Sequence, residues 1–384
     1  MAGEAFIRKR WQDILRTDAR FVKMQKIGEQ FSASVPAPFV GRFGYPSVSC
    51  GLLCPPESGK ETWKYDAPTY WASKHLGIPN IISYRGALLN TSRKCSVHEP
   101  PAYAKLAALS TQPVDVEIAL TKKPTWNLES DAVSSPTGPR AQLRRIAVTA
   151  NPKIPQKVER ITEDELLATE MMDLIHQKGY NENYLSRLLS VGLLGSNKRM
   201  VPTRWSITAT DDILGKQAIR SIQDYTSTDH ALYYGSYLGN HYLIMLLPDR
   251  FQFELFETML PVKERMEVST DHESYNGRSA YAAHCVGGYY TVRLAVAQKL
   301  AALKRQATVI VMRFVTEEYD TPLGVWVTRE AARIALERGE HFGSKEALLS
   351  RARHLVISNH RVDISPLLDA SKLLRERQVM LSTY

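Results

Sequence analysis

Residues 242–247 read Tyr-Leu-Ile-Met-Leu-Leu, a continuous apolar run of strand length. Such a run predicts a strand that is buried on both faces of a sheet. After Pro248-Asp249-Arg250, residues 251–256 read Phe-Gln-Phe-Glu-Leu-Phe, which is a second strand-like segment. We predict that the two segments pair as a β-hairpin across the short connection between them.

The segments around this pair mix strands and helices. The alternation of apolar and polar residues over Val114–Leu120 predicts a strand, as does the apolar run Thr308–Phe314. Helical spacing of apolar residues predicts helices over 290–303 and over 326–338, the second ending at Gly339. Because the order shows no repeating βαβ unit, we predict an α+β fold with a mixed sheet and flanking helices.

The N-terminal part begins with an expected long helix. Apolar residues recur at helical spacing from Glu4 to Phe31, which predicts one amphipathic helix. Residues 32–56 then contain many prolines and glycines, so we expect loops and strands there.

A second part of the chain is predicted to start near Asn151-Pro152. Thr162 and Glu165 have the spacing of a capping box, which predicts a helix that begins at this point and runs to about Lys178. We therefore divide the chain into residues 1–150, residues 151–370 and a flexible tail of residues 371–384.

Composition narrows the functional classes. The 384 residues carry a net charge of +9, and the basic residues occur in short clusters such as Lys198-Arg199. This balance favours a polyanionic partner. No apolar run approaches the roughly 20 residues that a transmembrane helix needs, and the N-terminus does not resemble a signal peptide. We expect a cytoplasmic, nucleoid-associated protein with no membrane partner.

The cysteines leave two interpretations open. Cys50 and Cys54 have the spacing of half a zinc site, which Cys95 and His98 would complete. The alternative is that these cysteines are small apolar residues buried in the core. We favour this alternative and expect no bound metal.

Several blocks combine glycine, aromatic residues and arginine in a way that core packing does not require. Glycine permits close approach of a ligand, and arginine beside an aromatic ring suits phosphates and bases. The blocks are 39–46, 201–212, 233–240, 284–293 and 319–326, the last leading into Arg329-Glu330 and Arg333.

Taken in order, these blocks closely resemble the archaeal Nre family of DNA repair proteins. The resemblance is carried by residues 201–212, Gly239-Asn240, Gly287 to Arg293 and 322–330, together with residues 39–46 and 66–71 near the N-terminus. It covers nearly the whole chain. The family implies a role in the DNA damage response, with DNA as a partner, and binding to the sliding clamp PCNA through a C-terminal peptide.

The last seven residues fit that implication. Gln378, Leu381 and Tyr384 are spaced so that they share one side of a 3₁₀-like turn. This spacing resembles the peptide by which repair proteins dock on PCNA. The chain stops where such peptides carry a second aromatic residue, so we expect a transient interaction.

Two candidate sites for chemistry remain. Asp211-Asp212 could hold Mg²⁺ if the protein is a nuclease, and His284 could act as a general base. The alternative for Asp211 or Asp212 is a helix N-cap before residues 213–224. We otherwise expect no cofactor.

Gly287-Gly288 before Tyr289 predicts an anion at a helix N-terminus, with Arg293 one turn on. The residues that we expect to contact nucleic acid or phosphate are Arg42, Arg204, Trp205, Asn240, Gly287, Gly288, Tyr289, Tyr290, Arg293 and Arg329.

Three functional classes stay open at this point. One is a clamp-associated repair protein that binds DNA or a nucleotide-type ligand. The second is a nucleic-acid-processing enzyme, either a nuclease or glycosylase-like, or a hydrolase that acts on a nucleotide. The third is a clamp-bound scaffold without DNA contacts of its own.

Overall fold

The computed structural model describes residues 11–124, 138–150, 152–262 and 266–375. Its contacts divide the chain into two compact units. The first contains residues up to 213 with residues 320–324, and the second contains residues 214–319 and the chain from 325 onward. The boundary expected near residue 150 falls inside the first unit. No described helix is long and apolar enough to span a bilayer.

The second unit is built on a mixed sheet. Within the described residues its strand order is β10-β9-β11-β8-β7-β12. The strands are β7 (His230–Tyr237), β8 (Asn240–Leu247), β9 (Gln252–Met259), β10 (Val268–Glu273), β11 (Thr308–Val315) and β12 (Gly339–Phe342).

The predicted hairpin between β8 and β9 is wrong. Strand β11 lies between them, antiparallel to β8 and parallel to β9. Thr308, at the start of β11, is opposite both Leu247 and Gln252, so β11 enters where the hairpin turn was expected. Because β11 is buried almost throughout, its central position covers more apolar surface than an edge position would.

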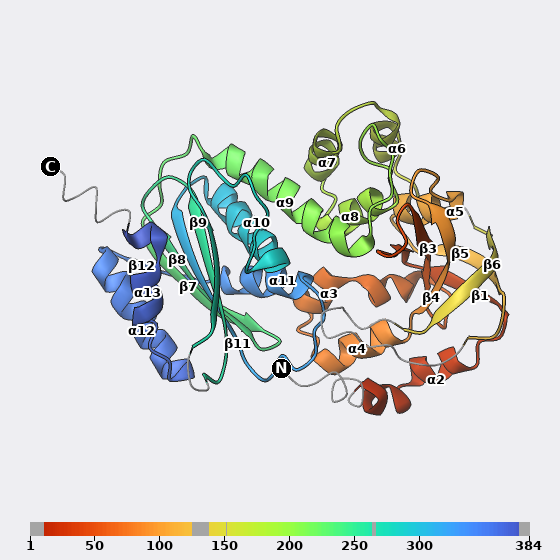
Figure 1. The fold of residues 1–384 in the computed structure, drawn as a ribbon, viewed down its shortest axis with the longest axis horizontal. Coiled ribbons are helices and arrows are strands. Elements are labelled where there is room, and N and C mark those ends of the chain that lie inside the picture. The colour runs from red at the N-terminus through yellow and green to blue at the C-terminus, as the bar shows by residue number, and fades with distance from the viewer. Residues whose placement is uncertain (1–10, 125–137, 151, 263–265, 376–384) are drawn as a thin grey trace. The chain divides into compact units, whose positions relative to one another are not determined.

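Helices cover both faces of this sheet (Figure 1). One face packs on α12 (Lys345–His360) and α13 (Ser365–Ala370) through Leu243, Met245 and Met312 from the strands, and Leu348 and Val356 from α12. The other face carries α10 (Val286–Leu303) and α11 (Trp326–Ala335). This two-sided cover explains why β8 and β11 read as unbroken apolar runs.

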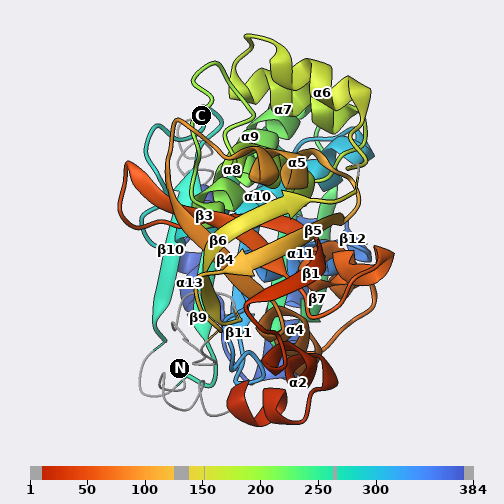
Figure 2. The ribbon, with the colours of Figure 1, turned by 90° about the vertical axis from the view of Figure 1, so that its right-hand side faces the viewer.

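The first unit contains a second mixed sheet with the order β1-β5-β6-β4-β3-β2 (Figure 2). The strands are β1 (Gln30–Val35), β2 (Ala37–Val40), β3 (Ser47–Cys54), β4 (Leu89–Ser96), β5 (Val114–Leu120) and β6 (Arg140–Val148). The strand predicted over 114–120 is confirmed, and its inward residues alternate as expected.

Short helices surround this sheet. They are α2 (Ala19–Gln25), the 3₁₀ helix η1 (Lys60–Asp66), α3 (Pro68–Ser73), α4 (Ile78–Gly86), α5 (Ala102–Leu109), α6 (Gln156–Glu163), α7 (Ala168–Gln177) and α8 (Glu182–Ser190). The chain then continues into α9 (Thr203–Ile222). Helices α5 and α8 pack against each other and on β2.

Two of the predicted helices are divided in the structure. The N-terminal helix is not continuous to Phe31, because residues 11–16 are helical, Asp18 caps a separate α2, and β1 starts at Gln30. Residues 4–10 lie outside the described residues. Thr162 does not cap a helix: it lies in α6, and its hydroxyl donates to Glu159 O. The capping glutamate belongs to α7, where Glu170 accepts the amide of Leu167 at 2.9 Å.

The overall α+β class is confirmed, as are the helices predicted over 290–303 and 326–338, observed as α10 and α11. Helix α11 ends at Ala335, however, and Gly339 is the first residue of β12. The flexible tail predicted over 371–384 does not begin at residue 371, because residues 372–375 are helical and Leu373 and Leu374 are buried. The rest of the predicted tail, beyond residue 375, lies outside the described part of the chain.

Candidate functional site

The loop between β2 and β3 presents two aromatic rings to solvent. Gly44 has φ +88°, and an added Cβ there would lie 2.7 Å from Ser47 O, so the turn requires glycine. Phe43 is 68% exposed and Tyr45 is 60% exposed. The guanidinium of Arg42 lies over the Phe43 ring at 4.6 Å from its centroid. The loop therefore combines apolar rings with a positive charge.

The start of α9 lies next to this loop. Thr203 Oγ1 accepts the amide of Val40, the last residue of β2, at 2.9 Å. The same hydroxyl contacts Ser190 Oγ at 3.1 Å. Immediately after this anchor come Arg204, which is exposed, and Trp205, which is 56% exposed. The predicted contacts Arg42, Arg204 and Trp205 thus come from two segments that the fold brings together.

A third segment joins them through the backbone. The amide of Val97, just beyond β4, donates to Pro46 O at 2.9 Å, and Val97 O accepts the amide of Met200 at 2.8 Å. Arg199 is therefore held near the same loop, and it is exposed. We call the exposed side chains of these segments the aromatic–arginine surface; they are Arg42, Phe43, Tyr45, Arg199, Arg204 and Trp205.

This surface suits unpaired nucleic acid. Exposed aromatic rings stack on bases without regard to sequence, and arginines bind the phosphates between them. Phe43, Tyr45 and Trp205 expose their rings on segments that hydrogen bonds hold together. Arg42 was predicted as a contact from the sequence, whereas Phe43 and Tyr45 were not, although two aromatic residues in a glycine-containing turn are typical of exposed rings.

The other predicted contacts lie inside the second unit. Asn240 is fully buried, and its Oδ1 accepts from Arg313 Nε at 3.0 Å. Arg313 also donates to Glu257 Oε1 at 2.6 Å. A Cβ added at Gly288 would lie 3.0 Å from that same Glu257 oxygen, so Gly288 allows α10 to approach the pair closely. Burial raises the pKa of the Tyr242 phenol beside this pair.

A second buried charge pair lies one turn along α10. Arg293 is 2% exposed and donates to Glu273 Oε2 at 2.8 Å. Its guanidinium also lies over the rings of Tyr289 and Tyr290, at 5.8 and 5.3 Å from their centroids. Arg329 is likewise buried, and its Nε donates to Glu330 Oε1 at 3.2 Å. Each of these predicted residues has an internal partner, and its assignment to nucleic acid stays a prediction.

The start of α10 already holds an internal anion. The Asp271 carboxylate accepts the amides of Ala283, His284 and Cys285 at 3.2, 2.8 and 2.7 Å. Arg278 donates to it at 3.1 Å. Burial raises the pKa of Asp271, but these hydrogen bonds outweigh burial and the pKa is lowered overall. Gly287 and Gly288 therefore open α10 beside a protein carboxylate, at the place where we expected a phosphate.

The predicted catalytic residues are not assembled. Asp211 is fully buried and lies inside α9 with the half-buried Asp212, so neither is the N-cap that we expected. His284 is exposed, and its Nδ1 lies 3.8 Å from Asp271 Oδ1. In the described part of the chain no three His, Cys, Asp or Glu side chains are grouped to hold a metal ion. His98 is exposed, and the Cys54 thiol contacts Leu52 O and Thr91 instead of the other cysteines.

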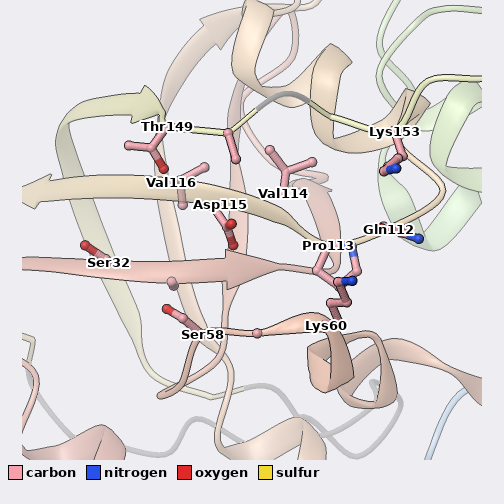
Figure 3. Close-up of a pocket in the computed structure, with 13 residues that line it drawn as sticks. Ser32, Ser58, Lys60, Gln112, Pro113, Val114, Asp115, Val116, Thr149 and Lys153 are labelled. Atoms are coloured by element: carbon pink, nitrogen blue, oxygen red, sulfur yellow. The ribbon is translucent and has the colours of Figure 1, made fainter.

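The first unit also contains a cavity of about 520 Å³ whose lining includes several polar side chains (Figure 3). Lys60, Gln112 and Lys153 lie at one end of it, and Ser32 and Thr149 lie at the other. Asp115 lies between them and accepts a hydrogen bond from Ser34. No sequence motif predicts this cavity, because its residues come from four separate segments.

Comparison with known proteins identifies a single family. Residues 9–263 match the family model described as "Archaeal Nre, N-terminal", and residues 273–384 match "Archaeal Nre, C-terminal". The chain is 34% identical to "DNA repair protein NreA" of Archaeoglobus fulgidus, over 88% of each chain. It is 34% identical to "DNA repair protein NreA" of Haloferax volcanii, over 79% of this chain and 77% of the relative. No solved structure matches the chain.

The hydrogen bonds of the Asp271 carboxylate predict how the stability of the protein depends on pH. Because the pKa of Asp271 is lower in the folded protein than its ordinary value of 3.8, its stabilisation is fully present above about pH 4 and is lost as the pH falls through the folded pKa. Asp271→Asn should lower the free energy of unfolding at neutral pH by about 2 kcal/mol and flatten the acid limb of the stability curve.

Denaturant unfolding between neutral pH and pH 3 measures both effects. Asp224→Asn is the matched control, since Asp224 is an exposed carboxylate of the same unit. Identical acid limbs for Asp271→Asn and the wild type would contradict this account of the α10 start.

Proposed function

The chain belongs to the archaeal Nre family, and we propose that it is a DNA repair protein that binds unpaired DNA through its aromatic–arginine surface. Relatives that match most of the chain are named DNA repair proteins, which supports the role. The observation that supports the binding mode is the exposure of Phe43, Tyr45 and Trp205 on adjacent segments that also carry arginines. A repair role would place the protein at the nucleoid in the cytoplasm.

The surface favours single strands over duplex for a physical reason. In a duplex the base faces are stacked on each other, so exposed rings of the protein gain nothing from them. In a single strand or at a lesion the faces are accessible, and each stacked base contributes about 1–3 kcal/mol. The net charge of +9 supplies the sequence-independent attraction to phosphates.

We also propose that residues 378–384 bind the sliding clamp PCNA. Gln378, Leu381 and Tyr384 carry the spacing of a clamp-binding peptide. These residues lie outside the described part of the chain, so the proposal rests on the sequence and on family membership. The peptide would order on binding, and its single aromatic anchor favours micromolar affinity, about −8 kcal/mol.

A nucleotide-type ligand is the second candidate, and the cavity of the first unit favours it. The two lysines at one end would bind a phosphate. Asp115 would accept hydrogen bonds from sugar hydroxyls, and the hydroxyls of Ser32 and Thr149 would donate to them or accept from them. Its volume of about 520 Å³ lies within the usual range for small-molecule sites.

The DNA-binding proposal predicts the effect of two neighbouring substitutions on α9. Trp205→Ala should raise Kd for a single-stranded oligonucleotide about 10-fold, because one stacked base is lost. Arg204→Ala should reduce the slope of log K against log salt by about 0.7, which is one phosphate contact on a single strand. Fluorescence anisotropy over a salt series measures both quantities.

Arg220→Ala is the matched control, since Arg220 is exposed on the same helix but distant in sequence from the surface. If all three variants bind like the wild type, the surface is not the DNA site. The enzymatic alternative makes a different prediction on the same oligonucleotides: cleavage or base release in Mg²⁺ that Asp211→Asn or His284→Ala abolishes.

The clamp proposal predicts that deletion of residues 378–384 abolishes PCNA binding in calorimetry and leaves Tm unchanged. Leu381→Ala and Tyr384→Ala should each weaken binding more than 10-fold, since each removes an apolar anchor. Ser382→Ala is the control, because it lies between the motif positions. Undiminished binding by the deleted chain would exclude this peptide as the docking element.

The cavity proposal predicts that AMP raises Tm, with an added stability of about 1.4 kcal/mol at ten times Kd. Lys153→Gln and Asp115→Asn should remove this shift, whereas Lys157→Gln, an exposed lysine of α6, should retain it. An equal shift in all variants would show that AMP binds elsewhere.

A further inference from the structure

Two cysteines lie side by side on adjacent strands of the first unit. In the antiparallel ladder of β3 and β4, Cys50 is opposite Arg93, and Val48 is opposite Cys95. Cys50, Arg93 and Cys95 therefore share one face of the sheet, and the two cysteines are diagonal neighbours. All four cysteines of the chain are free thiols.

The two thiols have unlike environments. Cys50 is fully buried, whereas Cys95 is partly exposed to solvent. The neighbouring Cys50 thiol lowers the pKa of Cys95 to about 6, and the interaction with Cys95 together with burial raises the pKa of Cys50. The Arg93 guanidinium adds to the lowering. The lowered pKa favours the thiolate of Cys95, which is partly exposed, beside the buried Cys50 thiol, whose pKa is raised.

The other cysteines lack this combination. Cys54 is fully buried beside Thr91, and burial raises its pKa to about 12. Cys285 is buried, with its sulfur 3.7 Å from Leu255 O, and burial raises its pKa as well. Both are expected to be unreactive, because the thiolate is the nucleophile.

We propose that Cys95 and Cys50 form a redox-active dithiol that hydroperoxides oxidise to a disulfide. The Cys95 thiolate attacks one oxygen of the peroxide, so an S–O bond forms, the O–O bond breaks, and the departing oxygen leaves as hydroxide or alkoxide. The Cys50 sulfur then attacks Cys95, so the S–S bond forms, the S–O bond breaks, and water leaves. The pair loses two electrons, and the peroxide is reduced to water and an alcohol, or to two waters if it is hydrogen peroxide.

The diagonal arrangement of Cys50 and Cys95 affects how readily a disulfide between them is reduced. Diagonal neighbours in a sheet are about 7–8 Å apart, which is beyond the Cα separation of roughly 4.4–6.8 Å that a disulfide usually spans. The two strands must therefore shift locally to close the bond. A disulfide formed at this cost is reduced readily, so we expect a reversible modification.

Thiol counting and peptide mapping test the proposal on the full chain. Treatment of the reduced protein with hydrogen peroxide should lower the free thiols from four to two, and mass spectrometry should find a Cys50–Cys95 link that dithiothreitol removes. Cys95→Ser should prevent the loss, and Cys50→Ala should leave Cys95 as a sulfenic acid that dimedone labels. Cys54→Ser, if folded, should form the link like the wild type.

The wild type also gives a readout that needs no variant. The rate of alkylation of Cys95 by iodoacetamide should have its midpoint near pH 6, and Arg93→Gln should move this midpoint upward. Four free thiols after peroxide treatment, a link between other cysteines, or an alkylation midpoint near that of a free cysteine at about 8.5 would each overturn the proposal.

Discussion

The hydroxyl of Thr203 accepts the amide of Val40 at 2.9 Å and so joins two segments that are 163 residues apart in the sequence. The first of these segments ends a strand and leads into the loop with Phe43 and Tyr45, and the second begins the helix with Trp205. The Val97 backbone adds the third connection, to Pro46 and Met200. Without these contacts the exposed rings would belong to independent loops, and their stacking on neighbouring bases would cost more chain entropy.

The buried charges of the second unit stabilise the fold. In the sequence, however, the same residue types resemble those of a binding site. Arginines paired with Glu257 and Glu273, and Asp271 bound by backbone amides, are the residue types that also bind phosphate and metal ions. Here each charge has a partner from the same unit. A buried pair is costly to break, because removing one member leaves the other unpaired in a low-dielectric interior. The Arg293–Glu273 pair and the Asp271 carboxylate connect α10 and its N-terminus to β10.

Much of the secondary structure could be predicted from the sequence, but the strand partners could not. The apolar runs at 242–247 and 308–314 identify buried strands by composition alone. No local sequence pattern shows that β11 lies between β8 and β9. The strand order depends on which strand is most stable in the centre of the sheet, with a neighbour on each side. The candidate site likewise could be predicted only in part. Arg204 and Trp205 were predicted from the sequence block that contains them. Their proximity to Phe43 depends on the contact of Thr203 with Val40, which no local sequence pattern indicates.

The central claim is that unpaired DNA stacks on the aromatic–arginine surface. Ultraviolet cross-linking of the protein to a single-stranded oligonucleotide, followed by mass spectrometry of the linked peptides, tests it directly. The account predicts that the cross-linked residues are Phe43, Tyr45 and Trp205, with the links competed away by single-stranded but not by duplex DNA. Cross-links confined to residues outside segments 41–47 and 199–205 would contradict it.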